Sequence, residues 1–186
     1  MTSMTTRSAC RGAGRTHVVA DSPIGPLTIV AQDGAITALY MDAPRHAPGP
    51  EAFGHPGDPA DEPFATAAVQ LTDYFAGRRT GFDLPLALAG TEFQRKVWAG
   101  LLAIPYGQTV SYGELARRIG SPAASRAVGL ANGKNPVAIV VPFHRVIGAD
   151  GSMTGYGGGL DRKRWLLEHE RAPGLRPEAL VLPGIG

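Results

Sequence analysis

The chain has 186 residues, of which 44% are hydrophobic and 18% are charged, with a formal net charge of +2. Such a composition can bury a core, which excludes a wholly disordered chain. The single cysteine excludes a disulfide scaffold and a cysteine-built zinc site, and no apolar run approaches the ~18 residues of a membrane span. The net charge is −3 over residues 1–90 and +5 over residues 91–186. The second half is therefore a candidate to meet a polyanion such as nucleic acid.

The first half predicts a disordered tail followed by a small α/β fold. Residues 1–16 contain no acid and almost nothing large and apolar, and the only thiol, Cys10, lies among them. A nucleophile needs a fixed partner base, so we expect no specific role for Cys10. Strand patterns from His17 to Tyr40 are broken by turn signals, and Asp33-Gly34 predicts a tight hairpin. Apolar residues at a spacing of three or four predict a helix over Phe64–Gly77.

The second half predicts helices joined by short turns. Thr91 is a candidate N-cap, and Ser111-Tyr112-Gly113-Glu114 has the spacing of a capping box at the start of a second helix. Ser121 as N-cap, with Pro122 at the first helical position, predicts a third helix over Ala123–Asn132. Two short helices around a tight Gly-Ser turn are typical of a helix-turn-helix.

The third of these helices is unusually rich in small residues around Arg126. They are Ala123, Ala124, Ala127, Gly129, Ala131 and Gly133. Small side chains give up contact energy, and glycine inside a helix costs about 1 kcal/mol relative to alanine. Either another surface, such as a nucleic acid groove, approaches this helix closely, or the helix is tightly packed inside the protein; the residues leave both open.

A base with its orienting acid is predicted near the C-terminus. The apolar run Val137–Val141 predicts a buried strand that ends just before Phe143 and His144. Glu170 lies on the apolar stripe of the last helix, where a carboxylate needs a partner, and His144 is the best candidate. A Glu–His hydrogen bond fixes the imidazole tautomer and raises its basicity. Such a pair normally activates a nucleophile, but phenylalanine at position 143 has none to offer.

The glycine-rich segment Gly155–Gly159 does not predict a phosphate-binding loop. It is neither a Walker loop nor a dinucleotide fingerprint, and it does not lie between a strand and a helix of a βαβ unit. A loop that lets a flat base lie beside Tyr156 fits this sequence better.

Taken together, the motifs resemble the O6-alkylguanine-DNA alkyltransferase family, the methylated-DNA–protein-cysteine methyltransferases. The match runs in order from about His17 to Arg171. It comprises Asp21-Ser22-Pro23-Ile24-Gly25, Pro105-Tyr106-Gly107, Ser111-Tyr112-Gly113-Glu114, Ser125-Arg126-Ala127-Val128-Gly129, Asn135-Pro136, Val141-Pro142-Phe143-His144-Arg145-Val146 and Gly155-Tyr156-Gly157-Gly158-Gly159.

The resemblance implies an α/β N-terminal domain followed by a mainly α C-terminal domain with a helix-turn-helix. We place these domains at residues 17–90 and 91–174, between tails at 1–16 and 175–186. It also implies a monomer that needs no cofactor, and no metal, because the family's zinc uses cysteines that this chain lacks. With no signal-peptide pattern, we expect an intracellular protein, which in a bacterium would be cytoplasmic and nucleoid-associated.

The resemblance further implies roles at the DNA. The helix-turn-helix enters the minor groove, Arg126 fills the gap left by an extruded base, and Tyr112 crowds the phosphate of the target nucleotide. Chemistry on a base inside a duplex requires this extrusion, and the inserted arginine offsets part of the unstacking cost. Ser125, Ala127 and Gly129 are the further DNA-binding candidates on the same helix.

At the active site, the resemblance implies that His144 acts through a water on the catalytic cysteine and that Glu170 orients His144. Asn135 joins the recognition helix to the active-site strand. The base pocket is expected to be lined by Pro142, Val146, Tyr156, Gly157, Gly158 and Gly159.

The chain departs from the family at Phe143, which stands where the family has its nucleophilic cysteine. It therefore resembles the alkyltransferase-like proteins, which replace this cysteine. This resemblance predicts non-catalytic recognition of O6-alkylguanine in duplex DNA, with hand-over of the lesion to excision-repair proteins. One alternative is a methylated-DNA–protein-cysteine methyltransferase whose acceptor cysteine has been lost or mutated to Phe143. Another is a helix-turn-helix transcription regulator without lesion preference.

Overall fold

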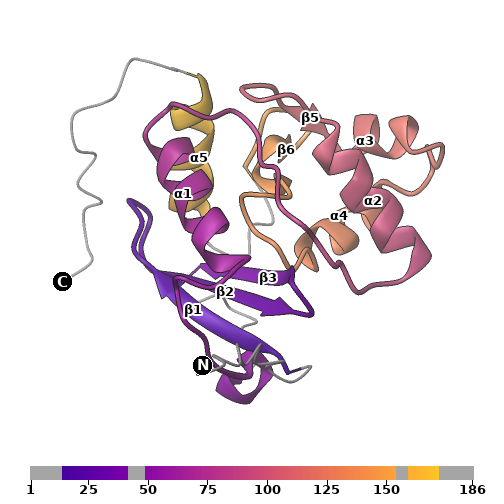
Figure 1. Cartoon of the computed structure of the whole chain (residues 1–186). Helices are drawn as coiled ribbons and strands as arrows, with labels where there is room; N and C mark the ends of the chain where they lie inside the picture. The colour runs from indigo at the N-terminus through magenta and orange to yellow at the C-terminus, as the bar shows by residue number, and fades with distance from the viewer. Residues whose placement is uncertain (1–13, 42–48, 154–158, 172–186) are drawn as a thin grey trace, which may run out of the picture.

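The computed structural model describes residues 14–41, 49–153 and 159–171. Figure 1 shows a sheet with one helix over it, followed by a group of helices that lies beside them. The sheet has the strand order β3-β2-β1-β4, with bounds Thr16–Ala20 for β1, Leu27–Gln32 for β2, Ala35–Met41 for β3 and His55–Pro56 for β4. A short 3-10 helix, η1 (Pro50–Phe53), precedes β4. The sheet begins at Thr16, one residue inside the segment expected to be a disordered tail.

The hairpin predicted at Asp33-Gly34 joins β2 to β3. Asp33 has φ +52° and Gly34 has φ +78°, the left-handed pair that a tight two-residue hairpin requires. The antiparallel register runs from Leu27 opposite Met41 to Gln32 opposite Ala35, with an irregularity between Val30 and Ala31. Strand β4 extends the sheet by pairing parallel to β1.

Helix α1 (Phe64–Phe75) lies over the sheet (Figure 1). Its buried positions include Phe64, Leu71 and Tyr74, which follow the predicted spacing. Gly77, with φ +71°, lies just beyond the end of the helix, as expected for a glycine after a C-cap. The last helix of the chain, α5 (Leu160–Arg171), packs against α1, where the ring centroids of Phe75 and Trp165 are 5.8 Å apart.

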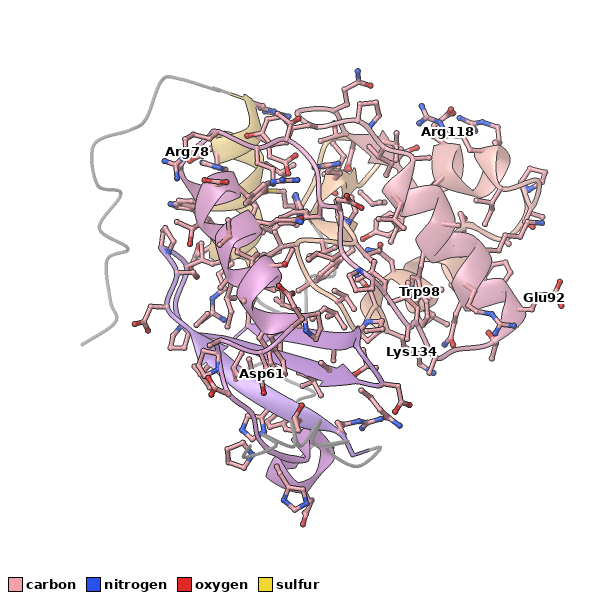
Figure 2. The ribbon with its side chains drawn as sticks, in the orientation of Figure 1. Asp61, Arg78, Glu92, Trp98, Arg118 and Lys134 are labelled. Carbon is pink, nitrogen blue, oxygen red and sulfur yellow. The ribbon has the colours of Figure 1, made fainter. Side chains whose placement is uncertain are left out.

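The C-terminal half contains α2 (Glu92–Leu102), α3 (Tyr112–Arg118) and α4 (Ser125–Gly133), which contact one another. The Thr91 hydroxyl caps α2, and the Gln94 side chain completes a capping box. Trp98 points from α2 toward α4 (Figure 2), and its indole N–H donates to the Ala131 carbonyl oxygen at 3.0 Å. Helices α3 and α4 follow one another along the chain and are in contact, and the helical C-terminal half agrees with the predicted fold class.

Two details of this region differ from the predictions. The Ser111 hydroxyl accepts from the Glu114 amide, but the Glu114 carboxylate pairs with arginines Arg117 and Arg118 rather than completing a capping box. Helix α4 begins at Ser125, not Ala123. The Ala124 N–H donates to the Ser121 carbonyl at 2.9 Å, so the Ser-Pro segment forms a turn before the helix rather than its first residues.

The strand predicted over Val137–Val141 is wrong: the segment is buried but folds into consecutive turns. Only Val137 bridges a strand residue, Leu39 of β3. Ile139 has φ +69°, unusual for a β-branched side chain, and the Val140 N–H donates to the Ala138 carbonyl at 2.7 Å. Burial was correctly indicated by the apolar run, but periodicity could not separate a strand from a buried turn.

The two halves share one hydrophobic core, which runs from the β2–β3 sheet through α2 to α5. A two-stranded parallel sheet of β5 (Val110–Ser111) and β6 (Val146–Ile147) lies at the edge of the helical half. No helix within residues 14–41, 49–153 and 159–171 is long and apolar enough to span a bilayer.

Candidate active site and DNA-binding surface

A buried 3-10 turn, η2 (Phe143–Arg145), carries the centre of the candidate site. Two successive tight turns deliver it: the Phe143 N–H donates to the Val141 carbonyl at 2.8 Å, and the Arg145 N–H to the Pro142 carbonyl at 3.0 Å. His144 is fully buried, and Phe143 is 6% exposed. The turn therefore replaces the end of the expected strand while still placing both side chains in the interior.

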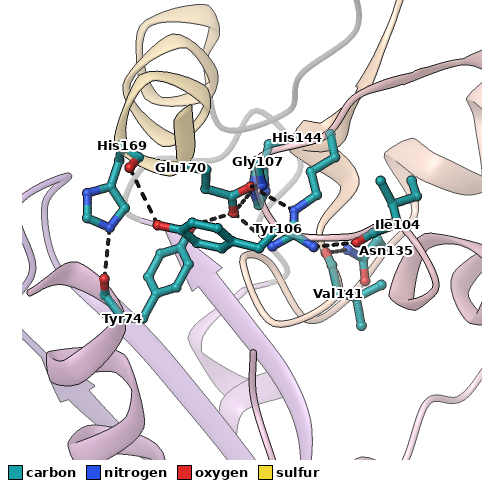
Figure 3. Close-up of polar contacts among 10 residues, drawn as sticks. Tyr74, Ile104, Tyr106, Gly107, Asn135, Val141, His144, His169 and Glu170 are labelled. Carbon is teal, nitrogen blue, oxygen red and sulfur yellow. Dashed lines mark hydrogen bonds and ion pairs between the residues drawn. The ribbon is translucent and has the colours of Figure 1, made fainter. Parts of the chain in front are cut away.

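The carboxylate of Glu170 is the hub of the polar contacts at this site (Figure 3). Its Oε1 atom accepts from the Tyr74 hydroxyl at 2.7 Å, from His144 Nε2 at 2.8 Å and from Arg145 Nη2 at 2.9 Å. Its Oε2 atom accepts from Arg145 Nε at 2.8 Å and from the Gly107 amide at 3.3 Å. The Glu170–His144 hydrogen bond expected from the sequence is present, within a larger network than the sequence indicated.

This network fixes the proton position on His144. Because a carboxylate only accepts, Nε2 carries the proton, and Nδ1 keeps its lone pair. Nδ1 is buried and has no hydrogen-bond partner within the part of the chain that the structure describes. Burial holds the pKa of His144 below its ordinary value, against the opposing effect of Glu170. The ring is therefore a neutral base at physiological pH, with one acceptor nitrogen that none of the described residues contacts.

Arg145 supplies the charge that keeps Glu170 ionised. Burial alone would raise the pKa of Glu170, but the hydrogen bonds from His144 and Arg145 outweigh it and hold that pKa well below its ordinary value. Arg145 is itself held by a hydrogen bond from Nη1 to the Ile104 carbonyl at 2.6 Å and lies 5.7 Å from the Tyr106 ring centroid. Sequence reasoning missed Arg145, although an arginine next to His144 in a buried segment was a usable signal.

Asn135 ties the end of α4 to the turn that precedes η2. Its side-chain amide donates to the Val141 carbonyl at 2.8 Å, and its carbonyl oxygen accepts from the Val137 amide at 3.1 Å. These contacts span the tight turns around Ile139 and satisfy backbone groups that no strand partner reaches. The structure thus brings Asn135 to the place where it was expected to link the recognition helix to the site.

The expected base-pocket residues are only partly described. Pro142 and Val146 are buried, and Gly159 has φ +93°, whereas Tyr156, Gly157 and Gly158 lie outside the described residues. Cavities of about 510 and 210 Å³ lie on the N-terminal half, and neither is lined by Phe143.

Lys163 is a second buried group that the sequence analysis missed. It comes from α5, is fully buried and donates from Nζ to the Val146 carbonyl at 2.6 Å. Burial lowers the pKa of Lys163 to about 8. The described residues contain no cluster of three or more His, Cys, Asp or Glu side chains suited to a metal ion.

Three of the candidate DNA-binding residues are exposed at the start of α4. Ser125, Arg126 and Ala127 are exposed on α4, whereas its opposite side, with Val128, packs into the core. Gly129 faces Tyr112 of α3, because a Cβ added there would lie 3.7 Å from the Tyr112 ring. The small residues therefore leave an open face on a helix that is packed on its other side.

Comparison with known proteins identifies both halves of the chain. The ribonuclease-like domain of 6-O-methylguanine DNA methyltransferase matches residues 16–88, and the DNA-binding domain of the same protein class matches residues 92–172. Both domains therefore match those of the O6-methylguanine DNA methyltransferases, and the second is the DNA-binding domain of that class.

Relatives at higher identity span both domains. A methylated-DNA–protein-cysteine methyltransferase of Mycobacterium bovis is 54% identical over 152 residues, which is 82% of this chain and 90% of the relative. The crystal structure of Mycobacterium tuberculosis O6-methylguanine methyltransferase has a TM-score of 0.79 and 50% identity, covering 90% of this chain and 98% of its own. A structure of Mycobacterium tuberculosis OGT in complex with DNA has a TM-score of 0.75 and 52% identity, covering 85% and 94%. This chain belongs to the methylated-DNA–protein-cysteine methyltransferase family.

This membership corrects the main functional expectation. The chain was expected to be a non-catalytic, alkyltransferase-like reader that hands lesions to excision repair, because Phe143 replaces the acceptor cysteine. The relatives that match both domains at about half identity are named as methyltransferases. That finding favours the alternative, in which the chain is a methyltransferase whose acceptor position has become phenylalanine.

Proposed function

We propose that this chain is a methylated-DNA–protein-cysteine methyltransferase whose acceptor cysteine has been replaced by Phe143, with the rest of the transfer machinery retained. Its DNA target is duplex DNA that carries O6-alkylguanine. The observation that carries this proposal is the buried hydrogen-bonded pair of His144 and Glu170. His144 directly follows position 143, and its Nδ1 atom has no hydrogen-bond partner among the described residues.

The chemistry of transfer explains why such a pair would be kept. A thiolate at position 143 would attack the alkyl carbon on O6, forming a C–S bond as the C–O bond breaks. The bond's electron pair stays on the guanine oxygen, and the proton from the thiol, taken through His144 Nδ1, neutralises the guanine. The alkyl group ends on the protein, so the reaction needs no cofactor. Phe143 can supply neither a thiolate nor a proton.

The DNA-binding side of the proposal rests on α3 and α4. Arg126 is exposed on α4, where it can enter the space of an extruded base, and Tyr112 lies where α3 meets α4. Small exposed residues such as Ala127 allow the helix to approach a groove closely. Extrusion of the nucleotide would bring the O6 substituent to the buried site, which an intact duplex cannot reach.

The test is to restore the acceptor. Phe143→Cys, combined with Cys10→Ser so that only one thiol is present, is incubated with a duplex containing O6-methylguanine and measured by intact-protein mass. We expect one methyl group per chain on the Phe143→Cys protein and none on the unaltered chain.

A Phe143→Ala control separates the chemistry from the packing. Phe143→Ala opens the same space without a thiol and should gain no mass. A Phe143→Cys protein that binds the methylated duplex yet stays unmodified would refute the proposal, as would a methyl group found on the unaltered chain.

A further inference from the structure

Tyr74 is the one side chain of the N-terminal domain that the described structure places in hydrogen-bond contact with the Glu170 carboxylate. Its hydroxyl donates to Oε1 at 2.7 Å, across 96 positions of sequence, and its side chain is fully buried. The same oxygen accepts from His144 and Arg145. Three donors thus converge on an oxygen with two lone pairs, so the hydroxyl competes directly with the imidazole.

Neighbouring aromatic rings hold the Tyr74 ring, and with it the hydroxyl oxygen, next to Glu170. The Tyr74 ring lies 5.2 Å from the Phe82 ring and 5.2 Å from the His169 ring, measured between centroids. The backbone carbonyl of Tyr74 is in turn bonded to His169 Nε2 at 2.8 Å. Burial raises the pKa of Tyr74 well above its ordinary value, so the group stays a donor over the whole working range of pH.

We propose that Tyr74 is a positioning residue through which the N-terminal domain sets how strongly Glu170 holds the His144 imidazole. Only the expected effect of Tyr74 on the rate of alkyl transfer rests on the proposed function. Donation from Tyr74 withdraws part of the negative charge on Oε1 and so weakens its hold on the Nε2 proton. His144 is thereby kept as a neutral base rather than an imidazolium.

Other charged and titratable groups also lie around His144 and Tyr74. Arg145 and Lys163 face His144, and Arg145 and Tyr106 face Tyr74. Lys163 titrates near pH 8, and burial raises the pKa of Tyr106. His169 stacks on the Trp165 ring and contacts the Tyr74 backbone, so it is followed in the same spectra.

The test measures the pKa of the His144 ring by NMR in the otherwise unaltered chain, with the ring identified by its loss in His144→Gln. Tyr74→Phe removes only the hydroxyl, and we expect the His144 pKa to rise by about one pH unit. Tyr40→Phe, which removes the hydroxyl of a half-buried tyrosine elsewhere in the N-terminal domain, should leave the His144 pKa unchanged. An unchanged or lowered pKa in Tyr74→Phe would overturn the proposal.

Two further measurements test the coupling, one in the unaltered chain without any substitution and one through the rate of alkyl transfer. In the unaltered chain, the Tyr74 Cζ resonance should shift over the pH range in which His144 titrates, and a resonance that ignores this titration refutes the coupling. In the Phe143→Cys background, Tyr74→Phe should move the acid side of the transfer-rate profile upward by the same amount as the His144 pKa. If Phe143→Cys transfers nothing, the proposed function fails, while the His144 titration still decides the role of Tyr74.

Discussion

Glu170→Gln is expected to cause a large loss of stability, because it leaves buried donors without an anion. Donors face both carboxylate oxygens of Glu170, whose side chain is 1% exposed. Arg145 donates to each of them, to Oε2 from Nε and to Oε1 from Nη2. A glutamine amide must therefore turn its NH₂ group toward an arginine donor in either orientation. Tyr74 and His144 could reorient their protons, but a guanidinium cannot accept.

The expected magnitude follows from leaving Arg145 buried without its anion. Removing one partner of a buried ion pair costs about 3–5 kcal/mol, which for a chain of this size lowers Tm by roughly 6–20 °C. Calorimetry at pH 7 measures the shift. Glu114→Gln is the matched control, because its carboxylate pairs with two arginines at the surface, where such pairs contribute little.

The same variant has a pH signature. The pKa of Glu170 is depressed below its ordinary 4.5, so its contribution is present above that pH and is lost as pH falls toward the folded-state pKa. The gap in unfolding free energy between the native chain and Glu170→Gln should therefore narrow in acid. Equal Tm losses for Glu170→Gln and Glu114→Gln, or a gap that widens below pH 4.5, would refute the reasoning.

Two further predictions concern Lys163 and Arg126. Because the pKa of Lys163 falls from 10.5 to about 8 on folding, the unfolded state binds more protons between these values, and stability should rise with pH there. Urea unfolding of Lys163→Met across pH 7–11 should lack this rise; a parallel profile for both proteins would contradict it. Arg126→Ala should weaken binding to an O6-methylguanine duplex about tenfold, and to plain duplex less, in a fluorescence titration. Arg95→Ala, an exposed arginine on α2, is the control, and equal losses on both duplexes would argue against base replacement by Arg126.

The sequence predicted the secondary structure best where a local signal specified it. Asp33-Gly34 requires left-handed backbone angles, and the Thr91 cap is a contact within one helical turn, so both could be read from neighbouring residues. The conformation of the run Val137–Val141 could not be predicted in this way, because it is set by contacts with Asn135 and with the edge of β3. Apolar content indicated that the run is buried but carried no information about those partners.

The candidate site shows the same division. Glu170 and His144 were paired because a carboxylate on an apolar stripe needs a partner and a buried-segment histidine was available. Tyr74 received no role in the sequence analysis, since nothing in residues 64–77 indicates that one hydroxyl reaches a carboxylate in the other domain. Arg145 was missed although it adjoins His144 in a buried segment, because its partners, Glu170 and the Ile104 carbonyl, are 25 and 41 positions away in the sequence. Residues that act across domains leave no periodic pattern in the sequence.

The backbone of Leu39 in β3 links the two domains of this protein. Its N–H donates to the Pro136 carbonyl at 2.9 Å, and its carbonyl accepts from the Ala138 amide at 3.0 Å. Backbone hydrogen bonds alone therefore attach the loop that leads to His144 to β3, a strand that is synthesised before the loop. Neither hydrogen bond uses a side-chain atom, so most substitutions at these positions keep the donors and acceptors, whereas proline at position 39 or 138 would remove one donor. The N-terminal domain therefore helps to hold the shape of the loop.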